Sequence, residues 1–411
     1  MSGVRVLSIL LLAACASEGG TSGPSVESRV VHKEFPIAAP AKLDLLFVVD
    51  NSPAIAAHRA NLVDNAHRFA AVLESFAGGL PDVHIGVITT DVGTRGADDP
   101  TSTASGDCTA DGDAGRLRTL PEITGRFLAD FPNTTGNRVR NYTGDLGNVL
   151  ASLLDAGATG CSFVRPLEAI RRALANPNNV GFLRDRAYLG VLVITARDDC
   201  SFTRSSFAEG AVDTFGCVTM PSALEPVEEF AAVLQGAKLD PYDVAVAAIS
   251  GPASPFVIDE SQRTIEPSCT FDTATGPVSA EPAVRLQAFL DQFPNRSTFS
   301  SICQADLSGA FAQIAQLPKV SLGLPCIDTP LLDIDPQTPG DQYECSVSLR
   351  DVYPDRVEER LIYECTGGPT ACWTITPEPN LGCPYGVAKV ANTFGATDAD
   401  HTLAVFECVA P

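Results

Sequence analysis

The stretch LLFVVDNSPAIAAHRANL, residues 45–62, contains the features that decide the fold. It opens with apolar residues that suit a strand buried on both faces, and its second half predicts a helix. Asp50, Asn51 and Ser52 lie at the junction. A carboxylate and a hydroxyl two residues apart at the carboxyl end of a strand offer oxygen ligands to a hard cation such as Mg²⁺ or Ca²⁺. A third oxygen two residues further on would complete such a group, but that position is Ala54.

Apolar runs and helical patterns alternate along much of the chain. The runs that predict strands are LDLLFVVD (43–50), VHIGVITTD (83–91), LGVLVITA (189–196) and DVAVAAIS (243–250). The patterns that predict helices lie at 62–76, 166–175, 223–235 and 280–293. Strands that are apolar on both faces need cover on both sides. The pattern therefore predicts a doubly wound, mostly parallel α/β sheet with helices on both faces.

The sequence changes character after about residue 318, where Pro and Asp become frequent and the helical period ends. Short alternating or β-branched runs follow, bounded by Gly and Pro, as is typical of strands. Six cysteines lie between Cys326 and Cys408. We therefore expect one large domain at 41–318 and a small, disulfide-rich β module at 319–411, in which bridges supplement a modest core.

The first 14 residues have the features of an export signal. Arg5 precedes the apolar run VLSILLLAA (6–14), which is too short to span a membrane. The run ends in Leu-Ala-Ala-Cys and resembles the lipobox of bacterial lipoproteins, which implies that Cys15 becomes the lipidated first residue of the mature protein. The alternative is an ordinary signal peptide with a chance cysteine. Residues 15–40 begin with a Gly/Ser-rich stretch and are expected to form a flexible tether.

Charge and anchor together limit the expected partners and location. The formal net charge of −22 opposes binding to nucleic acid and to anionic lipid, because like charges repel. We therefore expect no nucleic-acid partner, and membrane contact only through the lipid on Cys15. Because Ala16 and not Asp follows this cysteine, the lipoprotein resemblance implies a cell-envelope protein anchored in the outer membrane.

Removing Cys15 from the 13 cysteines leaves 12, an even number in a chain expected to be exported. This indicates a disulfide framework, and no Cys-x-x-Cys pair supports a zinc ribbon or a redox motif. Within the large domain we expect the bridges Cys108–Cys161, Cys200–Cys217 and Cys269–Cys303. The six C-terminal cysteines are expected to pair among themselves.

The segment DLLFVVDNSPAI (44–55) is similar to the first segment of the von Willebrand factor A (vWA) domain, whose metal-ion-dependent adhesion site has the form Asp-x-Ser-x-Ser. Thr159 in DAGATGC lies in the loop that matches the second segment, and VLVITARDDCS (191–201) matches the third. Four further segments resemble, in order, vWA-containing bacterial lipoproteins: HIGVITTDVG, GCSFVRPLEAIRRAL, GFLRDRAYLGVLVITARDDCS and SICQADLSGAFAQIA. The resemblance covers roughly residues 41–318 and implies a vWA-like binding domain.

The chain departs from the family pattern at two ligand positions. Ala54 stands where the family has its second Ser, and Ala196 stands where the family has the Asp of the third segment. Asp50, Ser52 and Thr159 remain. Mg²⁺ needs near-octahedral oxygen coordination and dehydrates reluctantly. We therefore expect a degenerate adhesion site that binds an ion weakly or is empty.

Other carboxylates offer two alternatives. Asp91, Asp198 and Asp199 follow strands and are candidates for compensating ligands, in a loose cage that suits Ca²⁺ better than Mg²⁺. The competing interpretation is that Asp198 and Asp199 cap a helix or a disulfide-bonded loop. The loop GDCTADGDAGRLR (106–118) resembles the start of an EF-hand, but its last residue, Arg118, stands where the bidentate Glu belongs.

Catalytic motifs give no support for an enzyme. The five histidines form no His-Glu-x-x-His motif, and neither a Gly-x-Ser-x-Gly elbow nor a phosphate-binding loop occurs. The sequence favours a lipid-anchored binding, adhesion or scaffold protein that contacts another protein or an envelope component. The alternatives are a ligand-binding adhesin that depends on Mg²⁺ or Ca²⁺ and, third, a secreted hydrolase with an unrecognised set of catalytic residues.

Overall fold

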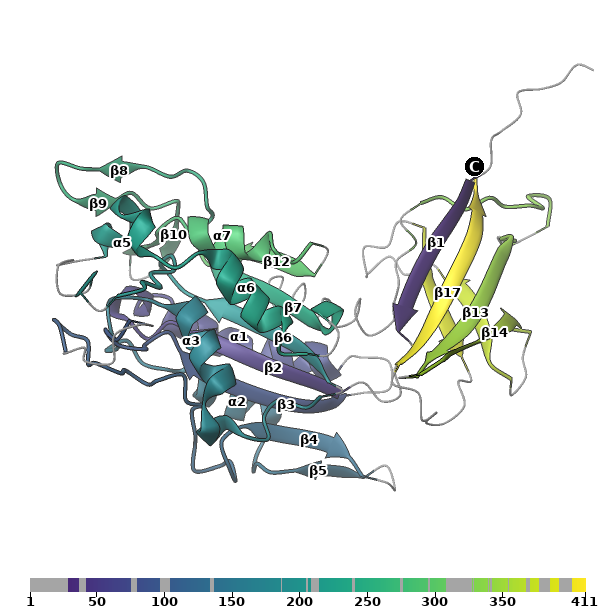
Figure 1. Cartoon of the computed structure of the whole chain (residues 1–411), viewed down its shortest axis with the longest axis horizontal. Coiled ribbons are helices and arrows are strands. Elements are labelled where there is room, and N and C mark those ends of the chain that lie inside the picture. The colour runs from purple at the N-terminus through teal and green to yellow at the C-terminus, as the bar shows by residue number, and fades with distance from the viewer. Residues whose placement is uncertain are drawn as a thin grey trace, which may run out of the picture.

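In the computed structural model the described residues form two large β-sheets and two small hairpins, and helices cover the larger of the two sheets (Figure 1). The residues described are 29–36, 42–74, 80–96, 104–133, 137–185, 187–204, 206–207, 214–238, 241–273, 276–294, 296–307, 327, 329–338, 340, 342–353, 355–366, 370–376, 385–391 and 401–411. Cys15, the export signal and the first part of the expected tether lie outside these ranges. None of the helices described has the length and apolarity that crossing a bilayer requires.

The larger sheet has seven strands. Their order across the sheet is β12 (Ser297–Ser301), β7 (Val244–Ser250), β6 (Tyr188–Ile194), β2 (Lys42–Val49), β3 (Asp82–Thr89), β4 (Leu128–Pro132) and β5 (Arg138–Arg140). The strands from β12 to β3 are parallel to one another, whereas β4 and β5 are antiparallel to their neighbours. Val49 pairs with Thr89 on one side and with Ile194 on the other, so β2, β3 and β6 end at the same level.

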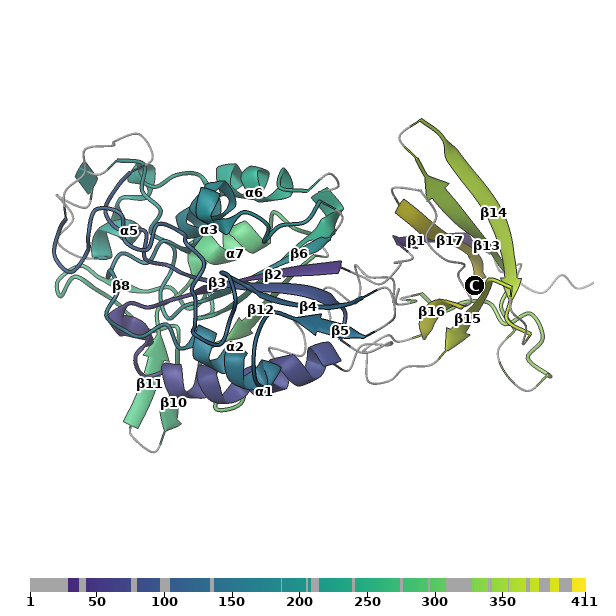
Figure 2. The same ribbon diagram turned by 90° about the horizontal axis from the view of Figure 1, so that it is seen from below.

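Helices lie on both faces of this sheet (Figure 2). One face carries α1 (Arg59–Glu74) and α2 (Leu146–Leu154). The other carries α3 (Pro166–Ala175), α6 (Val227–Gln235) and α7 (Val284–Leu290). The sixth α-helix described, α5 (Phe215–Thr219), is short.

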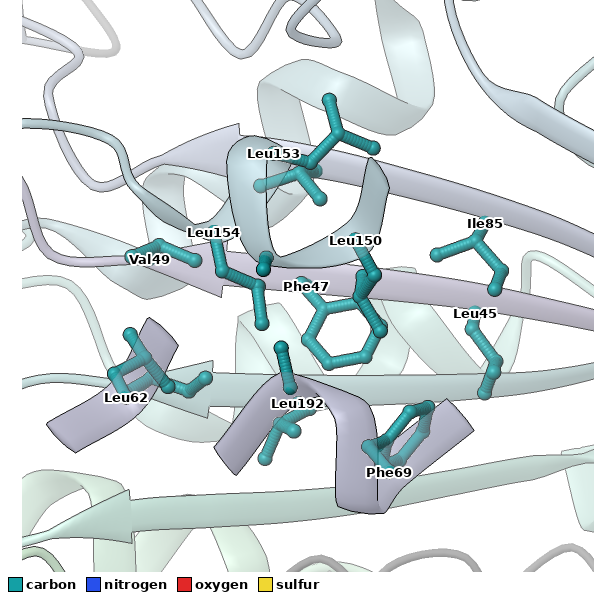
Figure 3. Close-up of a cluster of buried hydrophobic side chains, with 14 of the residues drawn as sticks. Leu45, Phe47, Val49, Leu62, Phe69, Ile85, Leu150, Leu153, Leu154 and Leu192 are labelled. Carbon is teal, nitrogen blue, oxygen red and sulfur yellow. The ribbon is translucent and has the colours of Figure 1, made fainter. Parts of the chain in front are cut away.

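The two faces of β2 show why the sheet needs cover on both sides. Side chains alternate along a strand, so Leu45, Phe47 and Val49 point to one face and Leu46 and Val48 to the other. All five are buried. Figure 3 shows the first face, where leucines of α1 and α2 and Phe69 surround Phe47. The rings of Phe47 and Phe69 meet edge to face with centroids 5.1 Å apart.

Short elements connect the strand ends to the helices. Four single turns of 3₁₀-helix are η1 (Pro53–Ile55), η2 (Pro177–Asn179), η3 (Pro221–Ala223) and η4 (Pro241–Asp243). Two small hairpins follow β7, one of β8 (Ile258–Asp259) with β9 (Thr264–Ile265) and one of β10 (Cys269–Thr273) with β11 (Gly276–Ala280).

The smaller sheet has six strands. Their order is β1 (Arg29–Pro36), β17 (His401–Ala410), β13 (Cys345–Val352), β14 (Val357–Glu364), β15 (Cys372–Thr376) and β16 (Val387–Ala391). Trp373 packs edge to face against Phe406 in a core with Leu349 and Ile362. Two disulfides lie here, Cys345–Cys408 and Cys365–Cys372. Cys326 and Cys383 lie outside the described residues.

Residues 29–36 correct the expected domain boundaries. The sequence assigns them to the flexible tether, but they form β1 and pair along their whole length with β17, from Arg29 opposite Ala410 to Pro36 opposite Leu403. The smaller sheet therefore combines the start of the described chain with its end. The strands and helices of the larger sheet lie between these two parts in the sequence, as an insertion.

Candidate functional site

The candidate site lies where β2, β6 and β7 end, at the edge of the larger sheet where α/β proteins bind ligands. Asp50 is the first residue after β2, and its amide donates to the carbonyl of Ile194 at 2.8 Å, which continues the pairing of β2 with β6. Its side chain is 0% exposed. The parallel strands thus place this carboxylate in the interior, beneath the loops that leave the sheet.

Both carboxylate oxygens of Asp50 accept hydrogen bonds from the protein. The amide of Ser52 donates to Oδ1 at 2.8 Å. The hydroxyl of Thr195 and the amide of Ala196 donate to Oδ2 at 3.0 and 3.3 Å. Burial raises the pKa of Asp50, and these hydrogen bonds oppose that rise. The carboxylate therefore joins the loop after β2 to the loop after β6.

Ser52 and Thr159, the two hydroxyl candidates, lie in different environments. Ser52 is 0% exposed and caps η1, since its Oγ accepts from the amide of Ala54 at 3.3 Å. Thr159 is exposed. The loop that carries Thr159 is fixed by its neighbour Gly160, whose amide donates to the carbonyl oxygen of Asn51 at 2.7 Å. A side chain at Gly160 would meet that of Asn51, so the close approach requires glycine.

Asp198 caps α7. Its Oδ2 accepts from the amide of Arg285 at 2.8 Å, and its Oδ1 accepts from the amide of Leu286 at 3.1 Å. Both donors lie in the first turn of the helix, where amides have no partner within the helix. Burial raises the pKa of Asp198 to about 7 against these hydrogen bonds. Asp198 thus caps a helix in the structure, which is the competing interpretation given above for the Asp198–Asp199 pair.

Asp199 serves a second helix. Its Oδ1 accepts from the amide of Leu167, in the first turn of α3, at 3.1 Å, and from the hydroxyl of Ser201 at 2.7 Å. Ser201 Oγ accepts in turn from the amide of Glu168 at 3.1 Å. On the other side of the carboxylate, Arg285 forms an ion pair with Oδ2 at 3.1 Å. Two consecutive aspartates after β6 thus hold the amino ends of two helices.

Asp91 and the carboxylates of the acidic loop after β3 also accept hydrogen bonds from other groups of the protein. Asp91 accepts from the amides of Gly93 at 3.0 Å and Cys161 at 3.1 Å. Burial raises the pKa of Asp91, and the nearby Asp113 and Asp107 raise it further. In the stretch that resembles an EF-hand, Asp111 is paired with Arg95 at 2.6 Å. Asp107 accepts from the hydroxyl of Ser162 at 2.5 Å.

The carboxylates at these strand ends do not form a set of ligands that fits a divalent cation. Asp50, Asp91, Asp198 and Asp199 each accept at least two N–H or O–H donors. The structure does not bring them together as one group of ligands. In the described part of the chain, one set of three Asp, Glu, His or Cys side chains has its ligand atoms within 4.8 Å of one another: Asp107, Cys108 and Cys161. Its two cysteines are bonded to each other.

Sequence reasoning missed two charged residues at this edge, Arg197 and Glu281. Nε of Arg197 lies 3.2 Å from Oε1 of Glu281, and the pair is only about a quarter exposed, 26% and 24%. The amide of Glu281 donates to the carbonyl oxygen of Ala196 at 3.0 Å. No local pattern signals this pair, because Arg197 follows β6 and Glu281 follows the β10–β11 hairpin.

Three disulfides surround the strand ends, and they are the three expected from the sequence: Cys108–Cys161, Cys200–Cys217 and Cys269–Cys303. The first joins the loop after β3 to the loop before α3. Between these loops lies Arg165, which is 0% exposed and stacks on Phe202 with the guanidinium carbon 3.9 Å from the ring centroid. Burial lowers the pKa of Arg165 to about 10. The edge is therefore built from loops that are covalently and electrostatically fixed.

Comparisons with known proteins find distant structural likeness only. No family model matches the chain. No curated protein sequence matches it. The conserved hypothetical protein BatB from Bacteroides thetaiotaomicron is 10% identical, with 68% of this chain and 98% of that one covered and a TM-score of 0.29.

Two further solved structures are similar to larger parts of the chain. The pilus adhesin SpaC from Lactobacillus rhamnosus GG is 9% identical with a TM-score of 0.33, over 93% of this chain and 41% of that one. Proximal thread matrix protein 1 from the mussel byssus is 11% identical with a TM-score of 0.28, over 72% and 51%. The chain thus spans about two fifths of the first protein and about half of the second.

Proposed function

We propose that this chain is a binding or scaffold protein of the cell envelope, anchored by a lipid on Cys15, whose vWA-like domain works without a bound divalent ion. One observation carries the proposal. At the ligand-binding edge of the larger sheet, Asp50, Asp198 and Asp199 are buried acceptors that fix the loops and the amino ends of two helices. Loops held in this way form a preorganised surface, and preorganisation lowers the cost of binding a partner.

The vWA assignment rests on motifs and on their position. The segments that resemble the family occur in order, and the Asp-x-Ser motif follows β2, the middle strand of the seven-stranded sheet, which has a parallel neighbour on each side. This is the edge at which such sheets bind ligands. The chemistry departs from the family at Ala54 and Ala196, and the remaining carboxylates have taken structural roles.

The surroundings of the histidines favour binding over catalysis. Nε2 of His58 lies 3.0 Å from the carbonyl oxygen of Ser279, and Nδ1 of His84 lies 2.9 Å from that of Phe182. In the described part of the chain neither histidine hydrogen-bonds a hydroxyl or a thiol, as the base of a catalytic pair does. We therefore assign the domain no reaction.

A crosslinking experiment tests the binding role. A photo-crosslinking amino acid is placed at Thr159, which is exposed at the strand-end edge, and, as a matched control, at Val180, which is 82% exposed between α3 and the amino end of β6. We expect one defined envelope component to crosslink from position 159 and not from position 180. Equal or absent crosslinking from both positions contradicts a binding surface at this edge.

Membrane fractionation tests the anchor. Cys15→Ser is expected to move the protein from the membrane fraction to the soluble fraction, because the variant lacks the lipid through which we propose it contacts the membrane. Ser22→Ala, in the same expected tether, serves as the control and should stay with the membrane. A Cys15→Ser protein that still fractionates wholly with membranes removes the lipid anchor from the proposal.

A further inference from the structure

The side chain of Arg197 connects two loops at the strand-end edge. Its Nε pairs with Glu281, which follows the β10–β11 hairpin, at 3.2 Å. Its Nη1 donates to the carbonyl oxygen of Ser162, in the loop between α2 and α3, at 3.4 Å. Arg197 itself belongs to the loop after β6, and its amide donates to the hydroxyl of Thr195 at 3.0 Å. One arginine therefore links three loops from different parts of the domain.

Glu281, the carboxylate paired with Arg197, lies in a desolvated site near a second carboxylate. Its side chain is mostly buried, and Asp50 is 0% exposed. Burial raises the pKa of Glu281, the positive charge of Arg197 lowers it, and the negative charge of Asp50 raises it. A cation beside such a carboxylate stabilises its charged form. Within the described residues, Arg197 is the cation that pairs with Glu281.

A metal ion at the ends of parallel strands would do two things: neutralise carboxylates and tie loops from different strands together. Arg197 does both. The two positions that lack a metal-type oxygen, Ala54 and Ala196, belong to the loop after β2 and to the loop that carries Arg197. The loss of oxygen ligands and the presence of a guanidinium thus coincide at one edge.

We propose that Arg197 is the built-in cation of this edge: its guanidinium does the work of a divalent ion, because it compensates Glu281 and holds the three loops together. The inference deepens the proposed binding function by giving the reason why the edge needs no metal. It concerns stability and ion dependence, so it fails or stands independently of whether position 159 crosslinks to a partner.

The first test is a double-mutant cycle read as melting midpoints. Arg197→Ala should lower the midpoint by several degrees, because Glu281 loses its cation, whereas Arg197→Lys should keep the midpoint close to that of wild type. Glu281→Gln should restore most of the loss in the Arg197→Ala background, since the neutral amide no longer needs compensation. The control is Arg356→Ala, which removes a surface pair with Glu358 that is 51% and 55% exposed, and it should change little.

The second test asks whether the edge regains an ion. The double variant Ala54→Ser, Ala196→Asp restores two oxygen ligands. It is compared with the triple variant that also carries Arg197→Ala. A rise in melting midpoint with Mg²⁺ or Mn²⁺ that is reversed by EDTA is expected only when Arg197 is absent, because the guanidinium and the ion compete for one place. If the triple variant does not fold, the Arg197→Ala protein alone is titrated with Mn²⁺, and it should bind more tightly than wild type.

Two results overturn the inference. One is a wild-type protein whose melting midpoint rises with Mg²⁺ or Ca²⁺ and falls with EDTA, because a divalent ion is then the resident cation. The other is an Arg197→Ala protein as stable as wild type, or one whose stability Glu281→Gln does not restore, because Arg197 then compensates nothing at this edge.

Discussion

Asp50 illustrates how a side chain with the position of a metal ligand can have a structural role. Its carboxylate is fully buried and accepts from the amide of Ser52, the hydroxyl of Thr195 and the amide of Ala196. Removing the acceptor leaves buried donors without a partner, which costs about 1–3 kcal/mol. We therefore expect Asp50→Ala to reduce the free energy of unfolding by about this amount in urea titrations, equally with Mg²⁺ and with EDTA.

The exposed Asp185 provides the control for that experiment. Asp185→Ala removes the same charge and should leave the free energy of unfolding almost unchanged. A wild-type protein that gains stability from Mg²⁺ or Ca²⁺, with the gain lost in Asp50→Ala, would show instead that Asp50 is a metal ligand.

His58 predicts a dependence on pH. Burial lowers its pKa, partly opposed by the hydrogen bond to Ser279 and by the charge of Asp50. The unfolded state, with the ordinary pKa, therefore takes up a proton at a higher pH than the folded state. The contribution of His58 to stability is complete above the unfolded pKa and is lost as the pH falls through the folded pKa, by at most about 1.4 kcal/mol per pH unit.

The measurement compares wild type with His58→Gln, whose amide nitrogen can still donate to the carbonyl of Ser279. Between about pH 7.5 and about pH 5.5, wild type should lose more stability than the variant, because glutamine does not titrate. Equal losses of stability in the two proteins would show that the pKa of His58 is the same in the folded and the unfolded state.

At the residue scale, the sequence predicts where Asp50, Ser52 and the Asp198–Asp199 pair lie, because each directly follows a recognisable strand. It leaves two roles open for the pair, ligand or cap. The choice depends on where the amino ends of α3 and α7 arrive, which the tertiary structure decides. The ion pair of Arg197 and Glu281 cannot be predicted from local sequence for the same reason, because its two residues come from different loops.

At the element scale, α3 depends on an acceptor that is not part of the helix. Asp199 accepts from the amide of Leu167, binds Ser201 and is paired with Arg285. Removing one member of a buried ion pair is strongly destabilising, by about 3–5 kcal/mol, because it leaves the other charge uncompensated. We expect Asp199→Ala to cost an amount in this range in urea unfolding.

Ser201→Ala is the graded control, since it removes the acceptor of a single α3 amide and one hydroxyl donor to Asp199 but keeps the ion pair. Its cost should be about 1 kcal/mol, as for the loss of a helix cap. If Asp199→Ala costs no more than Ser201→Ala, the pairing with Arg285 contributes nothing to the stability of the domain.

The predictability of the elements follows from their burial. The strands β2, β3, β6 and β7 are buried on both faces, and such runs are plain in the sequence. The edge strands β5 and β12, and β4 next to β5, are short and only partly buried, so they have no comparable pattern. The sequence predicts a mostly parallel sheet, and the structure adds two antiparallel strands at one side.

At the scale of the whole molecule, the main error of sequence reasoning concerns residues 29–36. A strand is recognised most easily beside its partner, and the partner of β1 lies at the other end of the chain. The Gly/Ser-rich stretch that precedes it also suggests a tether. Because β1 belongs to the smaller sheet, the larger sheet and its helices are inserted after the first strand of the smaller one.

This arrangement makes the smaller sheet depend on its first strand. Without residues 1–36, β17 loses eight paired residues and becomes an unprotected edge. Without residues 1–28, β1 remains. We expect hydrogen exchange followed by mass spectrometry to show faster exchange in β13 and β17 for the protein that starts at residue 37 than for the protein that starts at residue 29. Amides of β2 and β6 should exchange at the same rate in both, because the larger sheet contains its own core. The longer protein is the matched control for truncation as such. Equal protection of β17 in the two proteins would show that β1 contributes nothing to the sheet, and the tether would then extend to residue 40 as the sequence alone suggests.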